Sequence, residues 1–379
     1  MFDVKHLFAP LAGIDLDNLE LYVVGGAVRD TLLGLTPKDI DYVAVGASPN
    51  IFLELGFQQV GHDFPVFLHP KSHVEIALAR TERKTQQGHT GFVVHADPTV
   101  SLETDLLRRD FTMNAMAISR GGELIDPYGG QYDLEQRIMR HVSHAFTEDP
   151  LRVLRGVRFL SQLGQFDFSI APETITLMRS MSESLIELSV ERIVVELDKT
   201  LEASAPTHGL SMLEKLRVLE TLAPELKTIP VDFVSTSIDA RFAEWVMQNA
   251  PTLECVEHHA KRFRLTNRRI QLLKALIQIE QTPPNDPTSY LETMTKLGWL
   301  RGNTPDEVLD ALLLEFDQTG LLKHSAVRWI ALRERIRLIQ ASQFAQEGLS
   351  GKALGDAIYE ARLRVLSTEI SAPGTAPGL

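Results

Sequence analysis

The feature that most constrains this chain is a pair of adjacent glycines between an apolar run and a helix-like segment. Residues 21–30 (LYVVGGAVRD) are typical of a strand, a tight turn and the first turn of a helix. Because glycine has no side chain, the backbone at Gly25 and Gly26 can approach a phosphate group closely. The alternative interpretation is an ordinary strand-to-helix turn, and taken alone the glycine pair favours that alternative.

Two aspartates follow soon after the glycine turn, within residues 38–45 (KDIDYVAV). In a strand, residues i and i+2 point to the same face, so Asp39 and Asp41 are expected to share a face while Ile40 points to the buried side. Carboxylate pairs suit Mg²⁺, which fills the rest of its coordination sphere with phosphate oxygens and water. The apolar run after Asp41 favours a magnesium site over the alternative, a solvated turn.

A third carboxylate lies in residues 73–79 (HVEIALA), which read as another strand. A lone Glu75 in such a strand is most often an edge or solvent-facing residue. Together with Asp39 and Asp41, it becomes a candidate to help deprotonate an attacking hydroxyl or to hold a second metal ion.

Composition restricts the class of protein. The chain has 379 residues, so we expect more than one domain, and its net charge of −12 argues against non-specific binding to nucleic acid. Any contact with RNA must therefore use local basic clusters. The single cysteine, Cys255, fits a reducing compartment. Without an apolar run of bilayer length or a secretory signal, the sequence predicts a cytoplasmic protein with no membrane partner.

The pattern of apolar residues changes at about residue 141. Before it, short strands alternate with helices; after it, apolar residues recur at helical spacing and we expect no strand. The predicted strands span residues 21–24, 39–45, 73–79, 115–118 and 123–125. The sequence therefore predicts an α+β protein, with a small mixed β-sheet head followed by helices.

Arginines occur at two further places that suggest contact with a nucleotide. Arg29 falls on the first helical turn after the glycines, where a fixed cation would face a phosphate. Residues 105–115 (DLLRRDFTMNA) place Arg109 and Asn114 where they are candidates to hold ribose and phosphate. The alternative for this second stretch is a charged helix end capped by Asp110 or Asn114, and alone it favours that alternative.

Residues 148–159 (EDPLRVLRGVRF) carry a further set of charges at regular spacing. Pro150 suits the first turn of a helix, and Asp149 before it suits an N-cap. Steps of three residues then place Arg152, Arg155 and Arg158 on one side of that helix, facing the same space as Asp149. A cap with a solvated arginine face is the alternative, but three arginines in register exceed what a solvated face requires.

Taken together, these motifs resemble the class II tRNA nucleotidyltransferases, the bacterial CCA-adding enzymes of the polymerase-β-type nucleotidyltransferase superfamily. The resemblance includes residues 124–130 (LIDPYGG), is dense over residues 21–200 and is thinner afterwards. It implies a nucleotidyltransferase head at 1–140, a helical neck at 141–200, a helical body at 201–330 and a tail at 331–379 ending in a disordered C-terminus.

The resemblance also implies an activity and its residues. It implies sequential addition of C, C and A to the 3′ end of tRNA from CTP and ATP, with Mg²⁺ held by Asp39 and Asp41. The catalytic residues implied are Asp39 and Asp41, with Glu75 as a candidate. Nucleotide-binding positions fall on the glycine turn at Gly25 and Gly26 and on the charged side chains Arg29, Arg109, Asp149, Arg152, Arg155 and Arg158.

Base chemistry supports that assignment for Asp149 and Arg152. Cytosine and adenine both offer an amino donor beside a ring-nitrogen acceptor, which match a carboxylate next to a guanidinium. Guanine and uracil set an acceptor against Asp149, which leaves polar groups unpaired at a cost of about 1–3 kcal/mol each. Arg155 and Arg158 lie further along the helix and suit phosphates.

Two segments separate activities within the resemblance. Many relatives carry a metal-dependent phosphohydrolase domain of the HD type after the neck, but Met247 and Gln248 stand where its His-Asp pair is expected, and neither replaces those ligands. We therefore expect a helical scaffold without that activity, with the adjacent His258 and His259 pointing in different directions. Residues 80–92 are long enough for the flexible loop that CC-adding relatives lack.

Several alternatives remain open at this point. A poly(A) polymerase shares the head, but such enzymes usually carry a strongly basic extension that is not found here. A partial enzyme would add only CC or only A. A non-enzymatic tRNA-binding protein would not need the Asp39 and Asp41 pair, and a nucleotidyltransferase for small molecules would not need the long helical half.

Overall fold

The computed structural model describes residues 4–60, 66–84, 92–95, 98–301, 306–346 and 348–371, with no side-chain description for 81–84 and 92–95. The chain divides into two compact units. The first comprises residues Met1–Glu196 and Met212–Leu222, and the second Leu197–Ser211 and Ala223–Leu379. Among the described residues, no helix is both long and apolar enough to cross a membrane.

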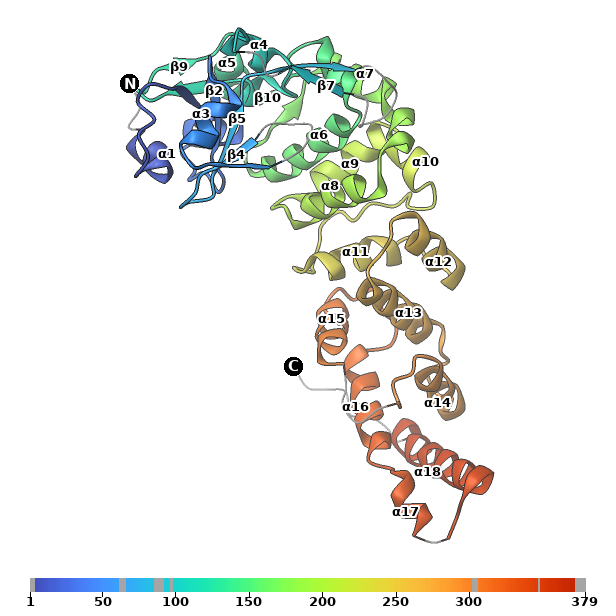
Figure 1. Cartoon of the computed structure of the whole chain (residues 1–379). Coiled ribbons are helices and arrows are strands. Elements are labelled where there is room, and N and C mark those ends of the chain that lie inside the picture. Colours follow the sequence, from blue (N-terminus) through green and yellow to red (C-terminus); the bar gives the residue numbers. More distant parts are fainter. Residues whose placement is uncertain are drawn as a thin grey trace. The chain divides into compact units, whose positions relative to one another are not determined.

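A seven-stranded mixed sheet forms the centre of the first unit (Figure 1). Its spatial order is β3-β4-β5-β2-β1-β8-β9. The strands are β1 (Glu20–Val24), β2 (Asp41–Val45), β3 (Gln58–Val60), β4 (Val66–Leu68), β5 (Glu75–Leu78), β8 (Ala117–Ser119) and β9 (Leu124–Ile125). The predicted α+β class, with a mixed sheet followed by helices, is confirmed.

Strand pairing fixes which residues meet at the centre of this sheet. β1 and β2 run antiparallel, with Val24 opposite Asp41. β2 and β5 run parallel, with Tyr42 opposite Ile76. The same register continued by one residue sets Glu75 beside Asp41, at the starts of two neighbouring strands.

The two faces of the sheet bury different residues because side chains alternate along each strand. Tyr42 and Ile76 face the larger core, where α1 (Lys5–Phe8), α2 (Gly26–Leu32) and α3 (Pro49–Glu54) pack. On the opposite face Val43 and Val24 join a second cluster with Leu102 and Leu106 of α4 (Leu102–Leu107). Asp41 shares its face with Val43, so its carboxylate lies on the α4 side.

Some strand boundaries in the structure differ from those predicted from the sequence. β2 begins at Asp41, and Asp39 lies in a bend just before the strand, so the two aspartates do not share one strand face. Ile40 is partly buried against the larger core, as expected. A short strand after residue 141 was also missed: β11 (Ser169–Ile170) pairs in parallel with β10 (Ile138–Met139), and two-residue strands are too short to show alternation.

The segment predicted as a long polar loop, residues 80–92, includes one strand of a small hairpin. β6 (Thr81–Lys84) pairs antiparallel with β7 (Phe92–His95). Residues 85–91, the central part of the predicted loop, lie outside the described residues.

Helix α6 (Leu151–Gln162) is the helix expected from the arginine spacing. Its residues Val153, Leu154 and Val157 are fully buried. Gly156 allows the close packing of this helix, because a Cβ at that position would lie 2.8 Å from the Met178 side chain and 2.9 Å from Phe111. The unit also contains α5 (Gly130–Glu135), α7 (Pro172–Ser180), the start of α8 (Val190–Glu202) and α10 (Val218–Leu222).

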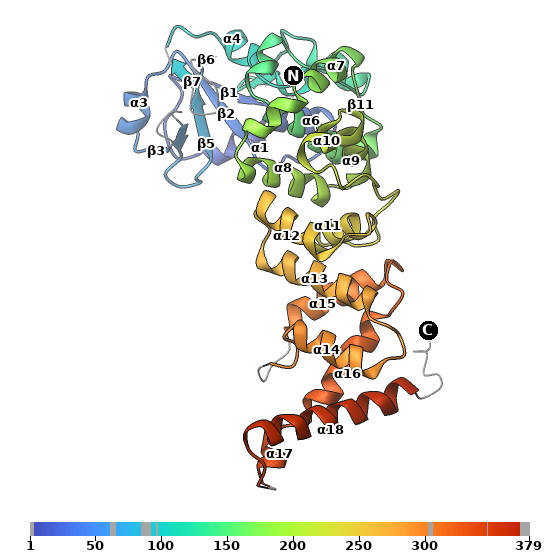
Figure 2. The same cartoon turned by 90° about the vertical axis from the view of Figure 1, so that its right-hand side faces the viewer.

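The described part of the second unit is helical and contains no strand (Figure 2). After α9 (Pro206–Lys215), which contributes to both units, its helices are α11 (Ile238–Met247), α12 (Leu253–Arg262), α13 (Asn267–Gln281), α14 (Pro287–Lys296), α15 (Glu307–Asp317), α16 (Ala326–Arg337), α17 (Ala341–Ala345) and α18 (Gly351–Ser371). Contacts join α18 to α14, α16 and α17. The four-part division at 140, 200 and 330 stays a prediction, and the tail predicted as disordered lies outside the described residues after 371.

Candidate active site

The turn between β1 and α2 is the first part of the site. Gly25 has φ +72° and ψ −133°, a backbone conformation that favours glycine. A Cβ at Gly25 would lie 3.1 Å from Nη1 of Arg109 and 4.0 Å from Oδ2 of Asp41. The missing side chain therefore leaves room for a guanidinium and a carboxylate, and the fold brings together three residues predicted from separate motifs.

The acidic residues gather at the start of β2. Asp41 retains solvent access, yet burial raises its pKa, and repulsion from Asp39 adds to this while Arg109 and Arg155 oppose it. Two accessible carboxylates that repel each other fit a hard divalent cation, which prefers oxygen ligands. Glu75 is exposed at the start of β5. Within the described residues, no three His, Cys, Asp or Glu side chains are arranged to hold a metal, so Glu75 does not complete a three-carboxylate cluster.

A buried acid, Asp105, holds the Arg109 side chain in place. Its Nη2 lies 3.2 Å from Oδ2 of Asp105, whose side chain has no exposed surface. Arg108 contacts the other oxygen of Asp105 at 2.9 Å. Burial alone raises the pKa of Asp105, but the two guanidiniums outweigh it and lower the pKa below its ordinary value. Asp105 is therefore ionised and anchors both arginines.

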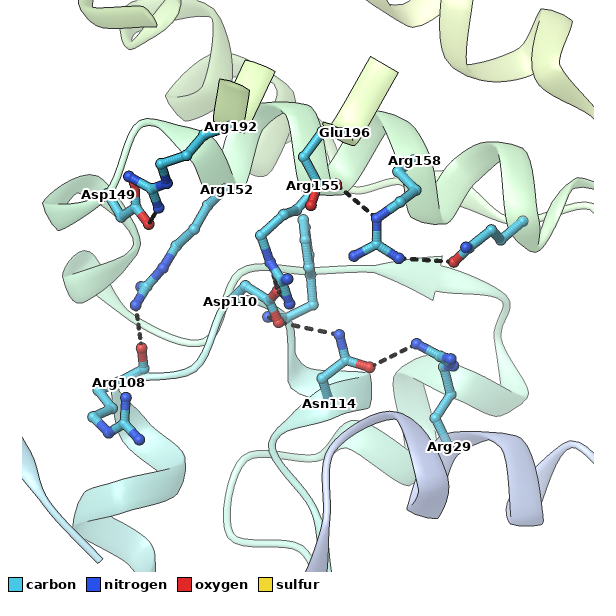
Figure 3. A network of polar contacts seen from close by, with 12 residues as sticks. Arg29, Arg108, Asp110, Asn114, Asp149, Arg152, Arg155, Arg158, Arg192 and Glu196 are labelled. Atoms are coloured by element: carbon cyan, nitrogen blue, oxygen red, sulfur yellow. Dashed lines mark hydrogen bonds and ion pairs between the residues drawn. The ribbon is translucent and has the colours of Figure 1, made fainter. Parts of the chain in front are cut away.

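A continuous hydrogen-bond network connects α2 to α6 (Figure 3). Nη1 of Arg29 donates to Oδ1 of Asn114 at 3.0 Å, and Nδ2 of Asn114 donates to Oδ1 of Asp110 at 3.1 Å. Nε and Nη2 of Arg155 reach Oδ2 of Asp110 at 2.8 and 2.6 Å. Burial raises the pKa of Asp110, but Arg155, Asn114 and the Phe111 amide together lower it below its ordinary value, so this acid is charged. The network links residues predicted from three of the motifs.

An aromatic ring lies among the arginines of this network. The guanidinium carbons of Arg158, Arg29 and Arg155 lie 4.1, 5.2 and 5.3 Å from the centre of the Phe159 ring. Arg158 also bonds Glu196 of α8, with Nε 2.6 Å from Oε2. Burial lowers the pKa of Arg158 and Glu196 counters this. Three cations can be held close together because a ring face and three acids, Asp30, Asp110 and Glu196, offset their repulsion.

Asp149 and Arg152, predicted to act together on the base, have different partners in the structure. Oδ1 of Asp149 accepts the amide of Leu151 at 3.0 Å, and Oδ2 lies 2.7 Å from Nη2 of Arg192. Arg152 donates from Nη1 to the carbonyl of Ala145 at 2.7 Å and from Nη2 to the carbonyl of Arg108 at 2.6 Å. Figure 3 shows the Arg152 side chain extending away from Asp149 toward Arg108.

Residues of α8 are the main part of this site that the sequence did not reveal. Arg192 and Glu196 lie four residues apart on one helix face, and they pair with Asp149 and Arg158 respectively. Their spacing was the available signal, since an i,i+4 pair of opposite charge marks one face of a helix. The partners lie about 40 residues away along the chain, which no local pattern indicates.

The segment compared with HD-type domains lies in the second unit. Met247 ends α11, and Gln248 follows it. His258 is exposed and His259 is buried, yet Nδ1 of each approaches Oε1 of Glu225, at 3.0 and 3.4 Å. The expectation that the two histidines point in different directions holds for their exposure, although the two Nδ1 atoms approach the same carboxylate. Burial lowers the pKa of His259, which keeps that ring neutral near pH 7.

Comparisons with known proteins agree with the motifs. Residues 21–140 match the family described as the poly A polymerase head domain. Residues 167–229 match the family described as the probable RNA and SrmB-binding site of polymerase A. The resemblance inferred from the motifs is confirmed for these regions.

Curated relatives extend this result over part of the chain. It is 53% identical over 211 residues to the CCA-adding enzyme of Blochmanniella pennsylvanica, covering 56% of this chain and 52% of that protein. It is 56% identical over 214 residues to the multifunctional CCA protein of Xylella fastidiosa, covering 56% of this chain and 51% of that protein. The chain thus spans about half the length of the curated relatives it matches.

Solved structures agree in fold over nearly the whole chain. The CCA-adding enzyme of Bacillus stearothermophilus in complex with CTP matches with a TM-score of 0.68 at 24% identity, covering 97% of this chain and 94% of that one. The CCA-adding enzyme of Thermotoga maritima complexed with tRNA matches with a TM-score of 0.60 at 22% identity, covering 97% and 95%. At these identities the likeness establishes the fold.

Proposed function

We propose that this protein adds C, C and A in sequence to the 3′ end of tRNA, using CTP and ATP and releasing pyrophosphate. The observation that carries the proposal is the meeting of Gly25, Asp41 and Arg109 at one end of the sheet. A glycine turn for phosphates, an acid for a metal ion and a cation for developing charge are the parts that nucleotidyl transfer requires. The curated relatives named above support the choice of tRNA, and with it a cytoplasmic location.

The reaction is attack by the terminal 3′-hydroxyl oxygen of tRNA on the α-phosphorus. A new phosphodiester bond forms, and the bond to the β-phosphate oxygen breaks to release pyrophosphate. Asp39 and Asp41 are the residues to hold Mg²⁺. When bound, the ion would lower the pKa of the attacking hydroxyl and balance charge at the phosphorus.

The other residues bind and orient the nucleotide. The backbone at Gly25 and Gly26 accommodates the phosphates, and Arg109 donates to them from the far side of the turn. Arg29, Arg155 and Arg158 supply further positive charge. Glu75, beside Asp41 across the β2–β5 pair, is the candidate to accept the proton of the hydroxyl.

Selection of C and A rests on Asp149. Arg192 and the Leu151 amide orient its carboxylate, so its remaining lone pairs accept hydrogen bonds in fixed directions. An amino group of cytosine or adenine satisfies such an acceptor, whereas the carbonyl of guanine or uracil does not. Arg152 is oriented by two carbonyls and is the candidate donor to the ring nitrogen.

One incubation tests the proposal against its alternatives. The protein is mixed with tRNA lacking its last three nucleotides, Mg²⁺ and each labelled nucleoside triphosphate, and the product length is read on a sequencing gel. We expect C, C and A and then arrest. Continued addition of A indicates a poly(A) polymerase, arrest after CC a partial enzyme, and unlabelled tRNA a binding protein or an enzyme with a small-molecule substrate.

A further inference from the structure

Asp105 occupies an unusual place for an acid that the reaction does not use. It lies on α4, and its side chain has no exposed surface. Three donors converge on it: Arg109 on Oδ2, and Arg108 and the backbone amide of Arg80 on Oδ1, the last at 3.3 Å. A buried carboxylate is stable only with such partners, so its contacts define where those partners can lie.

Arg109 is the partner that connects Asp105 to the site. Its Nη2 is taken by Asp105, while its Nη1 lies over Gly25 on the side where Asp41 lies. Its Nε is buried and has no hydrogen-bond partner among the described residues. Asp105 therefore holds the guanidinium through Nη2, and Nη1 remains as the donor for a ligand at the glycine turn.

The backbone contact adds a second constraint. Arg80 lies two residues after the end of β5, the strand that carries Glu75, and the Ala79 amide bonds to the Ala44 carbonyl of β2 at 2.8 Å. Asp105 thereby joins α4 to the end of the strand pair β2–β5. Its charge fixes Arg109 relative to the sheet that carries Asp41.

We propose that Asp105 is a positioning residue that holds Arg109 in place over the Gly25 turn for the triphosphate of the incoming nucleotide. This inference rests on the proposed function, because the ligand of Arg109 is the nucleotide of that reaction. Asp105 contacts neither substrate nor metal, so its loss affects phosphate binding for CTP and ATP alike and leaves the choice of base unchanged.

The test uses Asp105→Asn, which keeps the shape of the side chain and removes its charge. We expect the KM for both CTP and ATP to rise roughly tenfold, since a misplaced binding group loses much of its effect. The rate at saturating nucleotide and the ratio of C to U incorporation should stay within about twofold of wild type. Equilibrium binding of a fluorescent CTP analogue should weaken by the same factor as KM rises.

Two further variants separate positioning from general destabilisation. Glu244→Gln, at another buried acid that accepts the Val234 and Ser235 amides in the second unit, should lower the melting temperature without changing KM. Arg109→Met combined with Asp105→Asn should raise KM no further than Arg109→Met alone. If Asp105→Asn fails to fold, Asp105→Glu, which retains the charge but shifts it by one methylene, should fold and show the raised KM.

The results of these variants separate the positioning role of Asp105 from the proposed function. A folded Asp105→Asn or Asp105→Glu protein with wild-type KM and CTP binding overturns the inference and leaves the proposed function intact. Additive effects in the double variant also overturn it, because Asp105 then does not act through Arg109. A wild-type protein that neither binds the CTP analogue nor extends tRNA overturns the proposed function itself.

Discussion

The two units each contain an arginine–aspartate pair with one buried partner beside an aromatic ring. In the first, Arg155 reaches Asp110 at 2.6 and 2.8 Å and lies 5.3 Å from the centre of Phe159. In the second, Arg333 reaches Asp310 at 2.5 and 2.7 Å and lies 5.5 Å from Trp299. The local chemistry is the same, so any difference in role must come from what surrounds each pair.

The surroundings differ in two respects. The side chain of Arg155 is 35% exposed, whereas that of Arg333 is 3% exposed. Asp110 is hydrogen-bonded to Asn114, which is in turn bonded to Arg29. Arg333 instead makes its second ion pair with its chain neighbour Glu334. One pair is open to a ligand and connected to other arginines, and the other is closed. Such ion pairs thus mark a site where they are connected to other charges and accessible, and a scaffold where they are closed.

The largest effect should come from Asp41→Asn, which removes one carboxylate of the proposed metal site. We expect tRNA extension to fall by a factor of at least about 10³, because stabilisation of charge is usually the largest contribution to such catalysis. A gel assay of extension measures this, with the melting temperature as a check on folding.

The matched variant is Asp310→Asn in the second unit. It should lower the melting temperature but leave extension per folded molecule within about twofold, because Asp310 belongs to the closed pair. Loss of extension in Asp310→Asn, or its retention in Asp41→Asn, would remove the distinction between the two units.

The next largest effects are expected from substituting the two arginines, Arg155 and Arg333. Arg155→Met should raise the KM for CTP and ATP by about 10²-fold, because a partly exposed cation is lost from the proposed nucleotide site. Arg333→Met should lower the free energy of unfolding by roughly 3–5 kcal/mol, since it leaves Asp310 as an unpaired charge. Steady-state kinetics and urea denaturation measure both variants. Equal effects of the two on KM would contradict the comparison.

This comparison also shows how far the sequence could predict the molecule. The central strands β1, β2 and β5 were predictable because each is an apolar run with a turn signal before or after it. The strands β3 and β4 were not, because β3 consists largely of glutamines and both are only three residues long.

The site was predictable where its residues lie within single motifs. Gly25, Asp41 and Arg109 were found separately, and the fold brings them together. Asp39 was placed on the strand because a period of two gives the face of a residue but not the residue at which the strand begins. Arg192, Glu196 and the anchoring role of Asp105 were not found, because an ion pair between distant segments depends on tertiary packing, which local periodicity does not contain.

A smaller effect is expected of pH on the stability that Asp110, paired with Arg155, contributes to the fold. The pKa of Asp110 in the folded protein lies below its ordinary value near 3.9. A lowered pKa contributes stability that is fully present above that ordinary value and is lost as pH falls toward the folded value. The difference in unfolding free energy between wild type and Asp110→Asn should therefore be constant from about pH 5 to 7 and shrink below about pH 4. Urea denaturation across this range measures it, and a difference that grows in acid would contradict the ionised state of Asp110.

The smallest effect should come from Arg192, which orients a carboxylate and is not proposed to carry the chemistry. In Arg192→Met, Asp149 keeps its bond to the Leu151 amide but loses the partner of Oδ2, so its acceptor directions are less well defined. We expect incorporation of U relative to C to rise roughly tenfold, with the rate for CTP reduced less than that. Competition between labelled CTP and UTP measures the ratio. Arg179→Met is the matched control, because the Arg179 side chain donates to the Lys215 carbonyl in the same unit, and its loss should leave the ratio unchanged. If both variants keep wild-type selectivity, the Asp149 carboxylate is oriented without help from α8. The functional ion pairs of the first unit would then be limited to those made by the arginines of α6.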